Sequence, residues 1–137
     1  MKVVSQKVDP VFMTVINNYL ETTTREMGVA MRNTAYSALF NEGLDFTCAL
    51  FDEKGEMIAQ AEFIPAQLGA MRTVVEWTLQ EVGIENFHDG DVYLHNDPYR
   101  GGCHLPEYCV IAPIFYASEL IGFAAVIGHM TEVGGIA

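Results

Sequence analysis

The first regular pattern along the chain is helical. Over residues 11–35, apolar side chains recur every three or four positions, beginning with Val11 and Val15. This is the 3.6-residue rhythm of a helix with one apolar face, and Pro10 directly after an aspartate is typical of a helix start. Consecutive threonines and a glycine weaken the helical propensity, so the pattern leaves a kink or break near residues 22–28 open.

Shorter apolar runs then predict a hairpin and a second helix. Residues 46–51 are typical of a strand, residues 52–55 of a turn, and residues 56–61 of the returning arm of a β-hairpin. A helix is predicted over residues 66–82, with Gly83 as its natural end. Its apolar face comprises Leu68, Met71, Val75, Leu79 and Val82.

The last third of the chain predicts more strands. Residues 91–95 indicate a short strand, and residues 96–102 a loop rich in turn-forming residues. Residues 108–128 are apolar enough to resemble a membrane span, but Ser118 and Glu119 lie at the centre, which favours a buried β-hairpin. The predicted fold class is α+β, with two main helices packed on antiparallel β-hairpins.

We expect this fold to be an incomplete part of a larger domain. The sequence stops at a glycine-rich turn soon after its last predicted strand, and a hairpin alone is only marginally stable. Residues 1–137 are therefore interpreted as the N-terminal segment of a longer domain.

Composition excludes several classes of partner. The formal net charge is −11, and the seven basic residues are too scattered to form a positive face. Neither nucleic acid nor an anionic membrane surface is therefore expected to bind. Of three cysteines, Cys48 and Cys109 lie in apolar runs and are expected to be buried free thiols. This usage favours a reducing compartment, the cytoplasm.

Candidate chemistry gathers at the open end of the long hairpin. His104 and Glu107 are three residues apart on the incoming arm, and His129 and Glu132 are three apart on the outgoing arm. Imidazole nitrogen and carboxylate oxygen together bind divalent metals such as zinc, manganese or iron. We predict a metal site at His104, Glu107 and His129, and the alternative is a solvated hairpin end without a metal.

The register of the hairpin decides which of these groups face each other. A two-residue loop would set Glu107 opposite Gly128, whereas a three-residue loop would set it opposite His129. The sequence leaves both registers open, and in either one the polar groups converge away from the turn.

Two other carboxylates are candidates for catalytic roles. Asp97, in the loop NDPYRGG, is a candidate for the outer-sphere acceptor that orients a ligating histidine. Glu132 is a candidate general base or outer-sphere partner, and the sequence does not decide between the two. The same loop, with Arg100, alternatively suits the binding of an anion by backbone N–H groups.

Several motifs resemble the hydantoinase B/oxoprolinase family. The segment DFTCALFD at residues 45–52 resembles the family's DFSCALFD, and AQAEFIPAQLG at residues 59–69 resembles AQAEHIPVHLG. NDPYRGGCHLPE at residues 96–107 resembles NDPYRGGTHLPD, and the closing residues 129–135 are similar to HHADVGG. The matches run in order from about residue 9 to the end of the chain.

The resemblance implies a catalytic subunit in a hetero-oligomer with a hydantoinase A-type subunit or domain that binds ATP. The implied reaction is ATP-dependent opening of a cyclic amide such as a hydantoin or 5-oxoproline, with ATP-dependent carboxylation of a ketone as the alternative. In the acetone carboxylase branch, a His-x-x-Asp pair and a later histidine bind a divalent metal. His104, Glu107 and His129 fall on those positions.

The chain also departs from the family pattern. Glu107 and Glu132 stand where aspartate is usual, and Met130 replaces a common second histidine. One methylene moves a carboxylate by about 1.5 Å, whereas coordination distances tolerate only ~0.2 Å, so the backbone or rotamer must compensate. By itself the fragment is expected to be inactive. The rival hypothesis, from another class, is a non-catalytic assembly fragment that folds only against a missing remainder.

Overall fold

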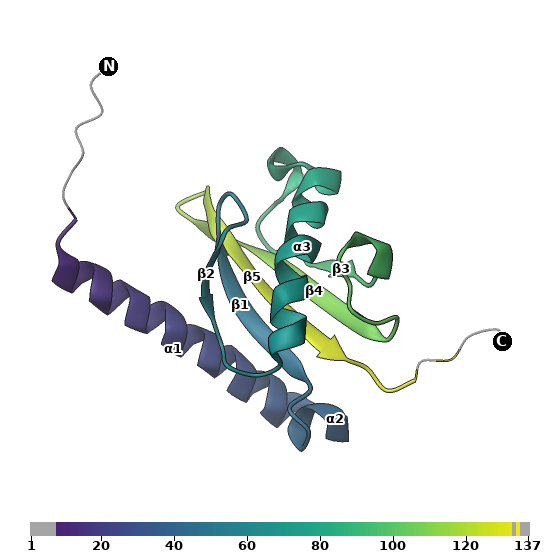
Figure 1. Cartoon of the computed structure of the whole chain (residues 1–137). Coiled ribbons are helices and arrows are strands. Elements are labelled where there is room, and N and C mark those ends of the chain that lie inside the picture. The colour runs from purple at the N-terminus through teal and green to yellow at the C-terminus, as the bar shows by residue number, and fades with distance from the viewer. Residues whose placement is uncertain (1–7, 133, 135–137) are drawn as a thin grey trace.

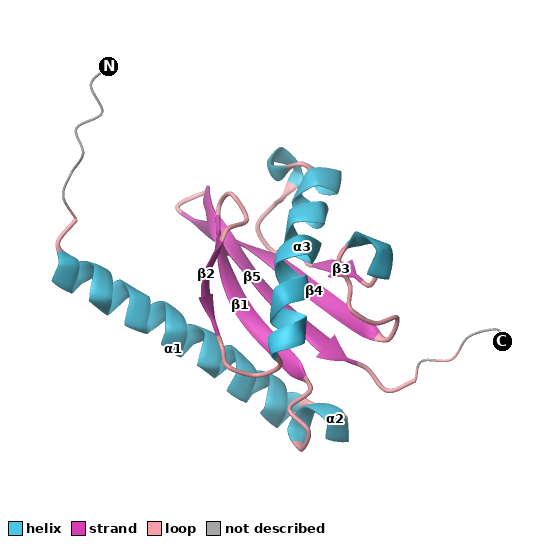
Figure 2. Ribbon diagram, viewed as in Figure 1, coloured by secondary structure: helices cyan, strands magenta, loops and turns pink. Residues whose placement is uncertain are grey.

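The computed structural model describes residues 8–132 and 134. Five strands form one sheet in the order β2-β1-β5-β4-β3, and every neighbouring pair is antiparallel (Figure 2). Three helices accompany the sheet, which confirms the predicted α+β class. The elements are α1 (Pro10–Thr34), α2 (Ala38–Asn41), β1 (Phe46–Asp52), β2 (Met57–Gln60), α3 (Pro65–Val82), β3 (Tyr93–His95), β4 (Glu107–Tyr116) and β5 (Glu119–His129).

Helix α1 runs without a break through the segment where a kink was left open. Asp9 caps its N-terminus, and the hydroxyls of Thr22 and Thr23 donate to the carbonyls four residues earlier, so they fit within the helix. Gly28 lies where a Cβ would come within 2.3 Å of the Phe63 ring. That glycine therefore allows the helix to approach the rest of the fold closely.

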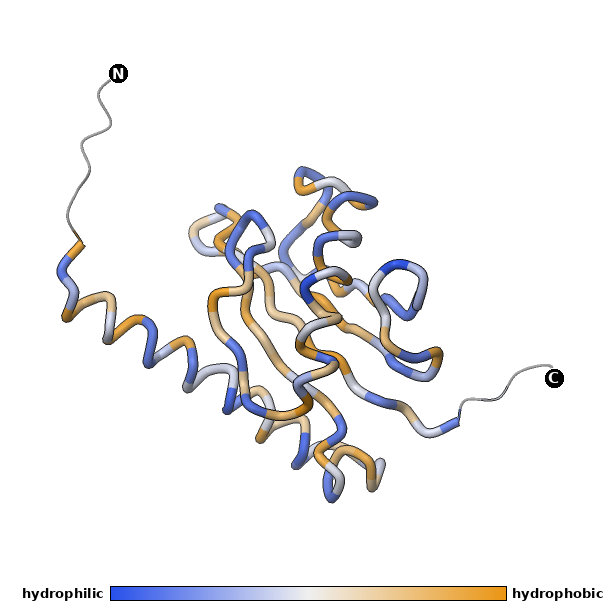
Figure 3. The backbone as a smooth tube through the Cα atoms, in the orientation of Figure 1, coloured by the Kyte–Doolittle hydropathy of each residue, from blue (hydrophilic) through white to orange (hydrophobic). Residues whose placement is uncertain are grey.

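The two long helices cover opposite faces of the sheet, because alternate side chains of β1 point to opposite sides (Figure 1). Phe46 and Cys48 pack into a cluster with Met27 and Met31 of α1, whereas Phe51 packs on the side of α3. The central strands accordingly take colours toward the hydrophobic end of the scale (Figure 3). The α3 side of the core includes Met71, Val74, Val75, Leu79, Ile111 and Ile127.

The β4–β5 hairpin combines the two registers that the sequence left open: it has the shorter loop of one and the Glu107–His129 pairing of the other. Its turn has two residues, Ala117 and Ser118, which both adopt positive φ (49° and 67°), as the tight hairpin turn that matches strand twist requires. The pairing then shifts by one residue, which leaves Ile121 as an extra residue in β5. Beyond this bulge Glu107 faces His129, although the loop is the shorter of the two considered.

The bulge lies where β5 passes close to β1. A Cβ on Gly122 would stand 2.3 Å from the carbonyl oxygen of Phe51, so only glycine fits without a shift. The pairing of β1 with β5 joins the two hairpins into one sheet, and the local pattern did not predict it. The resulting sheet brings the start of β4, the end of β5 and the start of β1 together.

Three short elements were not predicted. They are helix α2, capped by the side chain of Ser37, and 3-10 turns at Ile84–Asn86 and Pro98–Arg100, and each is too short to produce a periodic pattern. The apolar stretch at residues 108–128 is divided between β4 and β5, as predicted. Within residues 8–132 and 134, the helices include none with the length and apolar character that crossing a bilayer demands.

Candidate metal centre

His104, Glu107 and His129 form a cluster at the open end of the β4–β5 hairpin. One ligand atom from each lies within 4.8 Å of the others. The distance from Glu107 Oε1 is 3.2 Å to His104 Nδ1 and 3.9 Å to His129 Nδ1. The two imidazole rings stand edge to face with centroids 5.4 Å apart. The structure therefore brings together the three residues that the sequence pattern proposed.

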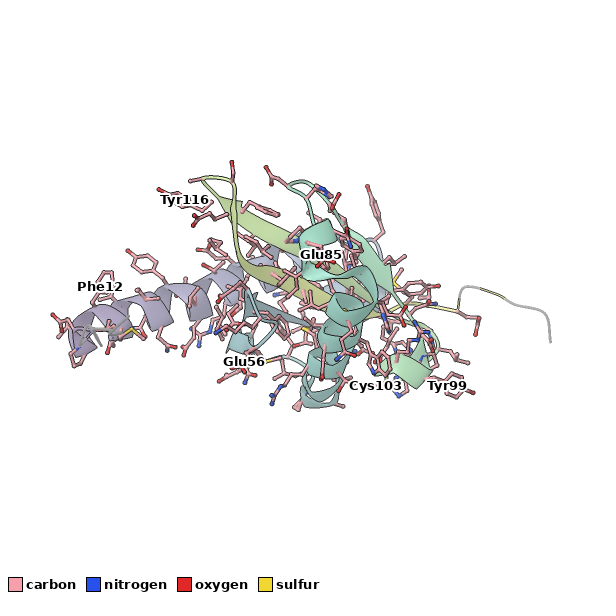
Figure 4. All side chains as sticks on the ribbon, turned by 90° about the horizontal axis from the view of Figure 1, so that it is seen from above. Phe12, Glu56, Glu85, Tyr99, Cys103 and Tyr116 are labelled. Carbon is pink, nitrogen blue, oxygen red and sulfur yellow. The ribbon has the colours of Figure 1, made fainter. Side chains whose placement is uncertain are left out.

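A tight loop places His104 beside the strand ends. Gly101 adopts the left-handed conformation (φ 102°), and a Cβ there would lie 2.9 Å from the backbone nitrogen of Val74 in α3. Arg100 holds the same loop against α3 through a 2.7 Å ion pair with Glu81 and by stacking over Trp77. In Figure 4 the neighbouring Cys103 lies at the opposite end of the sheet from the hairpin turn, marked by Tyr116.

Glu107 is the buried member of the cluster, with a side chain only 4% exposed. Its Oε2 accepts the backbone N–H of His104 at 3.2 Å, and its Oε1 accepts the side-chain amide of Gln67 at 3.2 Å. A buried carboxylate requires such donors, or a cation, to replace lost water. The pKa of the nearby Cys103 thiol is raised, first because the thiol is partly buried, and then by the negative charge and hydrogen bonding of Glu107.

Two residues that the sequence analysis missed connect this cluster to the rest of the fold. The Gln67 amide also donates to Asp45 Oδ1 at 2.8 Å, and the backbone carbonyl of Asp45 accepts the N–H of His129 at 3.0 Å. A signal for Gln67 existed in the sequence, because it precedes Met71 by four positions and so lies on the apolar face of α3.

The two predicted catalytic carboxylates lie outside the cluster. Asp97 caps a 3-10 turn, accepting the N–H of Tyr99 at 2.9 Å and lying 3.5 Å from the Arg100 guanidinium. Glu132 is exposed, and its Oε1 accepts the N–H of Gly134 at 2.9 Å. Asp97 thus shapes the loop before His104, and Glu132 follows His129 at the exit of β5.

The donor set suits a divalent metal. Two imidazole nitrogens and one carboxylate oxygen are the ligand types that zinc and similar ions accept, and three protein ligands leave a coordination position open. The side chain of His104 is 61% exposed, whereas Glu107 is buried, so the open side of the cluster faces outward past His104.

An apolar groove of about 500 Å³ lies on the other face of the sheet. Tyr108 and Val110 of β4 line it together with Val126 of β5, whereas Glu107 and His129 point to the α3 face. A small molecule in this groove would therefore be separated from the cluster by the sheet itself.

Known proteins resemble this chain over nearly its whole length. The sequence is 40% identical to 5-oxoprolinase 1 of Arabidopsis thaliana over 99% of this chain and 11% of that protein. It is 38% identical to caprolactamase subunit beta of Pseudomonas jessenii over 93% of this chain and 22% of that protein. The chain therefore spans between a tenth and a quarter of the length of these relatives.

Solved structures share the fold. The crystal structure of ATP-dependent caprolactamase from Pseudomonas jessenii superposes with a TM-score of 0.86 at 36% identity, covering 96% of this chain and 23% of that one. The nucleotide-free structure of acetone carboxylase gives a TM-score of 0.80 at 22% identity, over 88% of this chain and 16% of that one. At that identity the second likeness concerns the fold alone.

The model of the Hydantoinase B/oxoprolinase family matches residues 9–137, nearly the whole sequence. The chain therefore belongs to the Hydantoinase B/oxoprolinase family.

Proposed function

We propose that this chain is the metal-binding part of a catalytic subunit in an ATP-dependent enzyme that opens a cyclic amide. The observation that carries the proposal is the convergence of His104, Glu107 and His129 within 4.8 Å on the folded sheet. Relatives named 5-oxoprolinase and ATP-dependent caprolactamase support the reaction class, since both names denote the opening of a lactam.

In this proposal His104, Glu107 and His129 hold one zinc, manganese or iron ion. When bound, such an ion supplies Lewis acidity toward a carbonyl or phosphoryl oxygen. Glu107 is held by its two hydrogen bonds from His104 and Gln67, so its carboxylate is already oriented toward both imidazoles. The exposed side of His104 leaves room for a substrate to approach.

We assign supporting roles to the two remaining carboxylates. Asp97 holds the loop that carries His104, because its side chain caps the turn and faces Arg100. Glu132, exposed after the end of β5, is assigned as general base or outer-sphere partner of the substrate. The assignment of Glu132 follows from its position along the chain rather than from contact with the cluster.

We further propose that ATP binds to a partner subunit or domain of the hydantoinase A type, in a hetero-oligomer. The name caprolactamase subunit beta supports an enzyme of several subunits. The free thiols of Cys48, Cys103 and Cys109 suit a reducing, ATP-containing cytoplasm, where we place the enzyme.

Metal analysis of the whole protein tests the central claim. We expect about one divalent ion per chain, and we expect His104→Ala to lose it because the remaining two ligands are insufficient. The matched control is His88→Ala, since His88 is exposed and, among residues 8–132 and 134, its side chain pairs with Asp91 alone. Unchanged metal content in His104→Ala would rule out the site.

Substrate class requires a separate assay with the partner present. ATP hydrolysis is measured with 5-oxoproline, a hydantoin, caprolactam and a simple ketone in turn. Stimulation by a cyclic amide supports the proposal, whereas stimulation by the ketone alone replaces amide opening with carboxylation.

A further inference from the structure

We infer that Gln67 is a positioning residue that fixes the Glu107 carboxylate for metal binding by tying it to Asp45. The inference rests on the proposed metal site and goes beyond it, because Gln67 itself contributes no ligand atom to the cluster. It assigns a role to a polar side chain that is only 2% exposed on the apolar face of α3.

The side-chain amide of Gln67 connects two acidic groups from different strands. Its Nε2 donates to Asp45 Oδ1 at 2.8 Å and to Glu107 Oε1 at 3.2 Å, so both amide hydrogens are used. Asp45 directly precedes β1, and Glu107 begins β4. Without this shared donor, the buried Glu107 carboxylate and the half-buried Asp45 carboxylate would each lose a hydrogen bond that replaces water.

The orientation of the amide is determined by the carboxylates. Among the described residues, Gln67 Oε1 is buried and has no hydrogen-bond partner. Turning the amide over would direct this oxygen at two negatively charged groups and would remove both hydrogen bonds. The two hydrogen bonds to carboxylates are charge-assisted, which is the stronger kind, and they outweigh the cost of one unpaired carbonyl.

The same connection reaches the third ligand. The backbone carbonyl of Asp45 accepts the N–H of His129 at 3.0 Å, so Asp45 contacts His129 through its backbone and Glu107 through Gln67. Gln67 thus completes a closed path between the two strands that carry Glu107 and His129. Outer-sphere partners of this kind hold ligands in place before the metal arrives.

Zinc affinity measured on the whole protein tests the role. Gln67→Leu fills a similar volume on an apolar face but has no donor, and Gln67→Glu keeps the shape while replacing the donor with a third carboxylate. The control is Thr78→Val, since Thr78 is also buried in α3 but its hydroxyl donates to the Val74 carbonyl within the helix. Thermal unfolding of each metal-free variant reports stability separately.

We expect both Gln67 variants to bind zinc roughly 10–100-fold more weakly, the usual effect of losing an outer-sphere partner. The visible spectrum of the cobalt(II)-loaded protein should change as well, because Glu107 no longer has a fixed position. Thr78→Val should retain wild-type affinity and spectrum.

Wild-type affinity and spectrum in Gln67→Leu, or in Gln67→Glu should the leucine variant not fold, would overturn this inference alone. Equal loss of thermal stability in Gln67→Leu and Thr78→Val with unchanged zinc binding would reduce Gln67 to a packing role and also overturn it. A wild-type protein that binds no zinc, manganese or iron would overturn the proposed function, and this inference with it.

Discussion

Glu107 on β4 lies directly opposite His129 on β5, with 3.9 Å between Glu107 Oε1 and His129 Nδ1. The turn alone does not produce this pairing, because an unbroken ladder from a two-residue turn would set Glu107 against Gly128. The bulge at Ile121 supplies the missing residue. The geometry of the candidate metal centre therefore depends on a distortion nearer the other end of the same hairpin.

Gly122→Ala should test that dependence. The added methyl would meet the Phe51 carbonyl at 2.3 Å, so β1 and β5 must move apart or β5 must change register. We expect a loss of about 1–3 kcal/mol in the free energy of unfolding, the usual cost of overpacking, measured by denaturant titration. A reduced zinc affinity should accompany it.

Gly69→Ala is the matched control for this substitution. Gly69 lies in α3 with nothing within 4 Å of an added Cβ, and alanine favours a helix more than glycine does. The control should gain about 0.5–1 kcal/mol in stability and leave zinc binding unchanged. Equal stability changes in the two variants would contradict the close approach at Gly122.

Glu107→Gln should show which of the two glutamates near the hairpin end, Glu107 or Glu132, binds the metal. The amide keeps the shape of the side chain but removes the negative charge that faces both imidazoles, so zinc binding should fall sharply. Glu132→Gln should leave zinc binding unchanged, because Glu132 lies outside the cluster. Isothermal titration calorimetry with zinc measures the affinity of both variants. Comparable losses of zinc affinity would mean that Glu132 also binds the metal.

Asp97 offers a test of how the loop before His104 is held. Asp97→Asn keeps an oxygen that accepts the N–H of Tyr99, whereas Asp97→Ala removes this cap. We expect the alanine variant to lose about 1 kcal/mol of stability and some zinc affinity, and the asparagine variant to resemble the wild type. Loss of zinc affinity in the asparagine variant would show that the charge of Asp97 matters.

Thiol reactivity should distinguish Cys103 from the other two cysteines. Burial raises the pKa of Cys48 and of Cys109 to about 12, so both remain protonated thiols at pH 8, and the thiolate is the reactive form. A disulfide reagent such as DTNB should therefore modify only Cys103 in the folded protein and all three cysteines after unfolding. Rapid modification of two thiols in the folded state would contradict the buried positions.

The reaction of Cys103 also reports on Glu107. Partial burial, and then the negative charge of Glu107, raise the pKa of the Cys103 thiol. In the metal-free protein, Glu107→Gln removes that charge, so the pKa of Cys103 should fall, the thiolate fraction at pH 8 should rise, and modification should be faster. The rate in His88→Ala should match the wild type.

Much of the fold was predictable because the helices and strands have regular apolar periods. The pairing of β1 with β5 was not, since it joins residues such as Cys48 and Val126 that no local pattern connects. The bulge at Ile121 lies beside this pairing, next to the point where Gly122 packs against Phe51. The hairpin register therefore could not be chosen from the turn sequence.

The three candidate ligands could be predicted because their types and spacing suit a metal. Gln67 and Asp45 were missed, because their role appears only when α3, β1 and β4 are packed together. A polar residue on an apolar helix face, as at Gln67, was the available signal.

One consequence concerns how this polypeptide behaves at high concentration. Between Pro10 and Leu20 no side chain carries a charge, and that part of α1 extends past the sheet with exposed apolar residues such as Phe12 (Figure 4). We expect this uncharged part of the helix, with its exposed apolar side chains, to promote self-association in a concentrated sample. Because hydrophobic attraction weakens on cooling, chilled samples should scatter less light than warm ones.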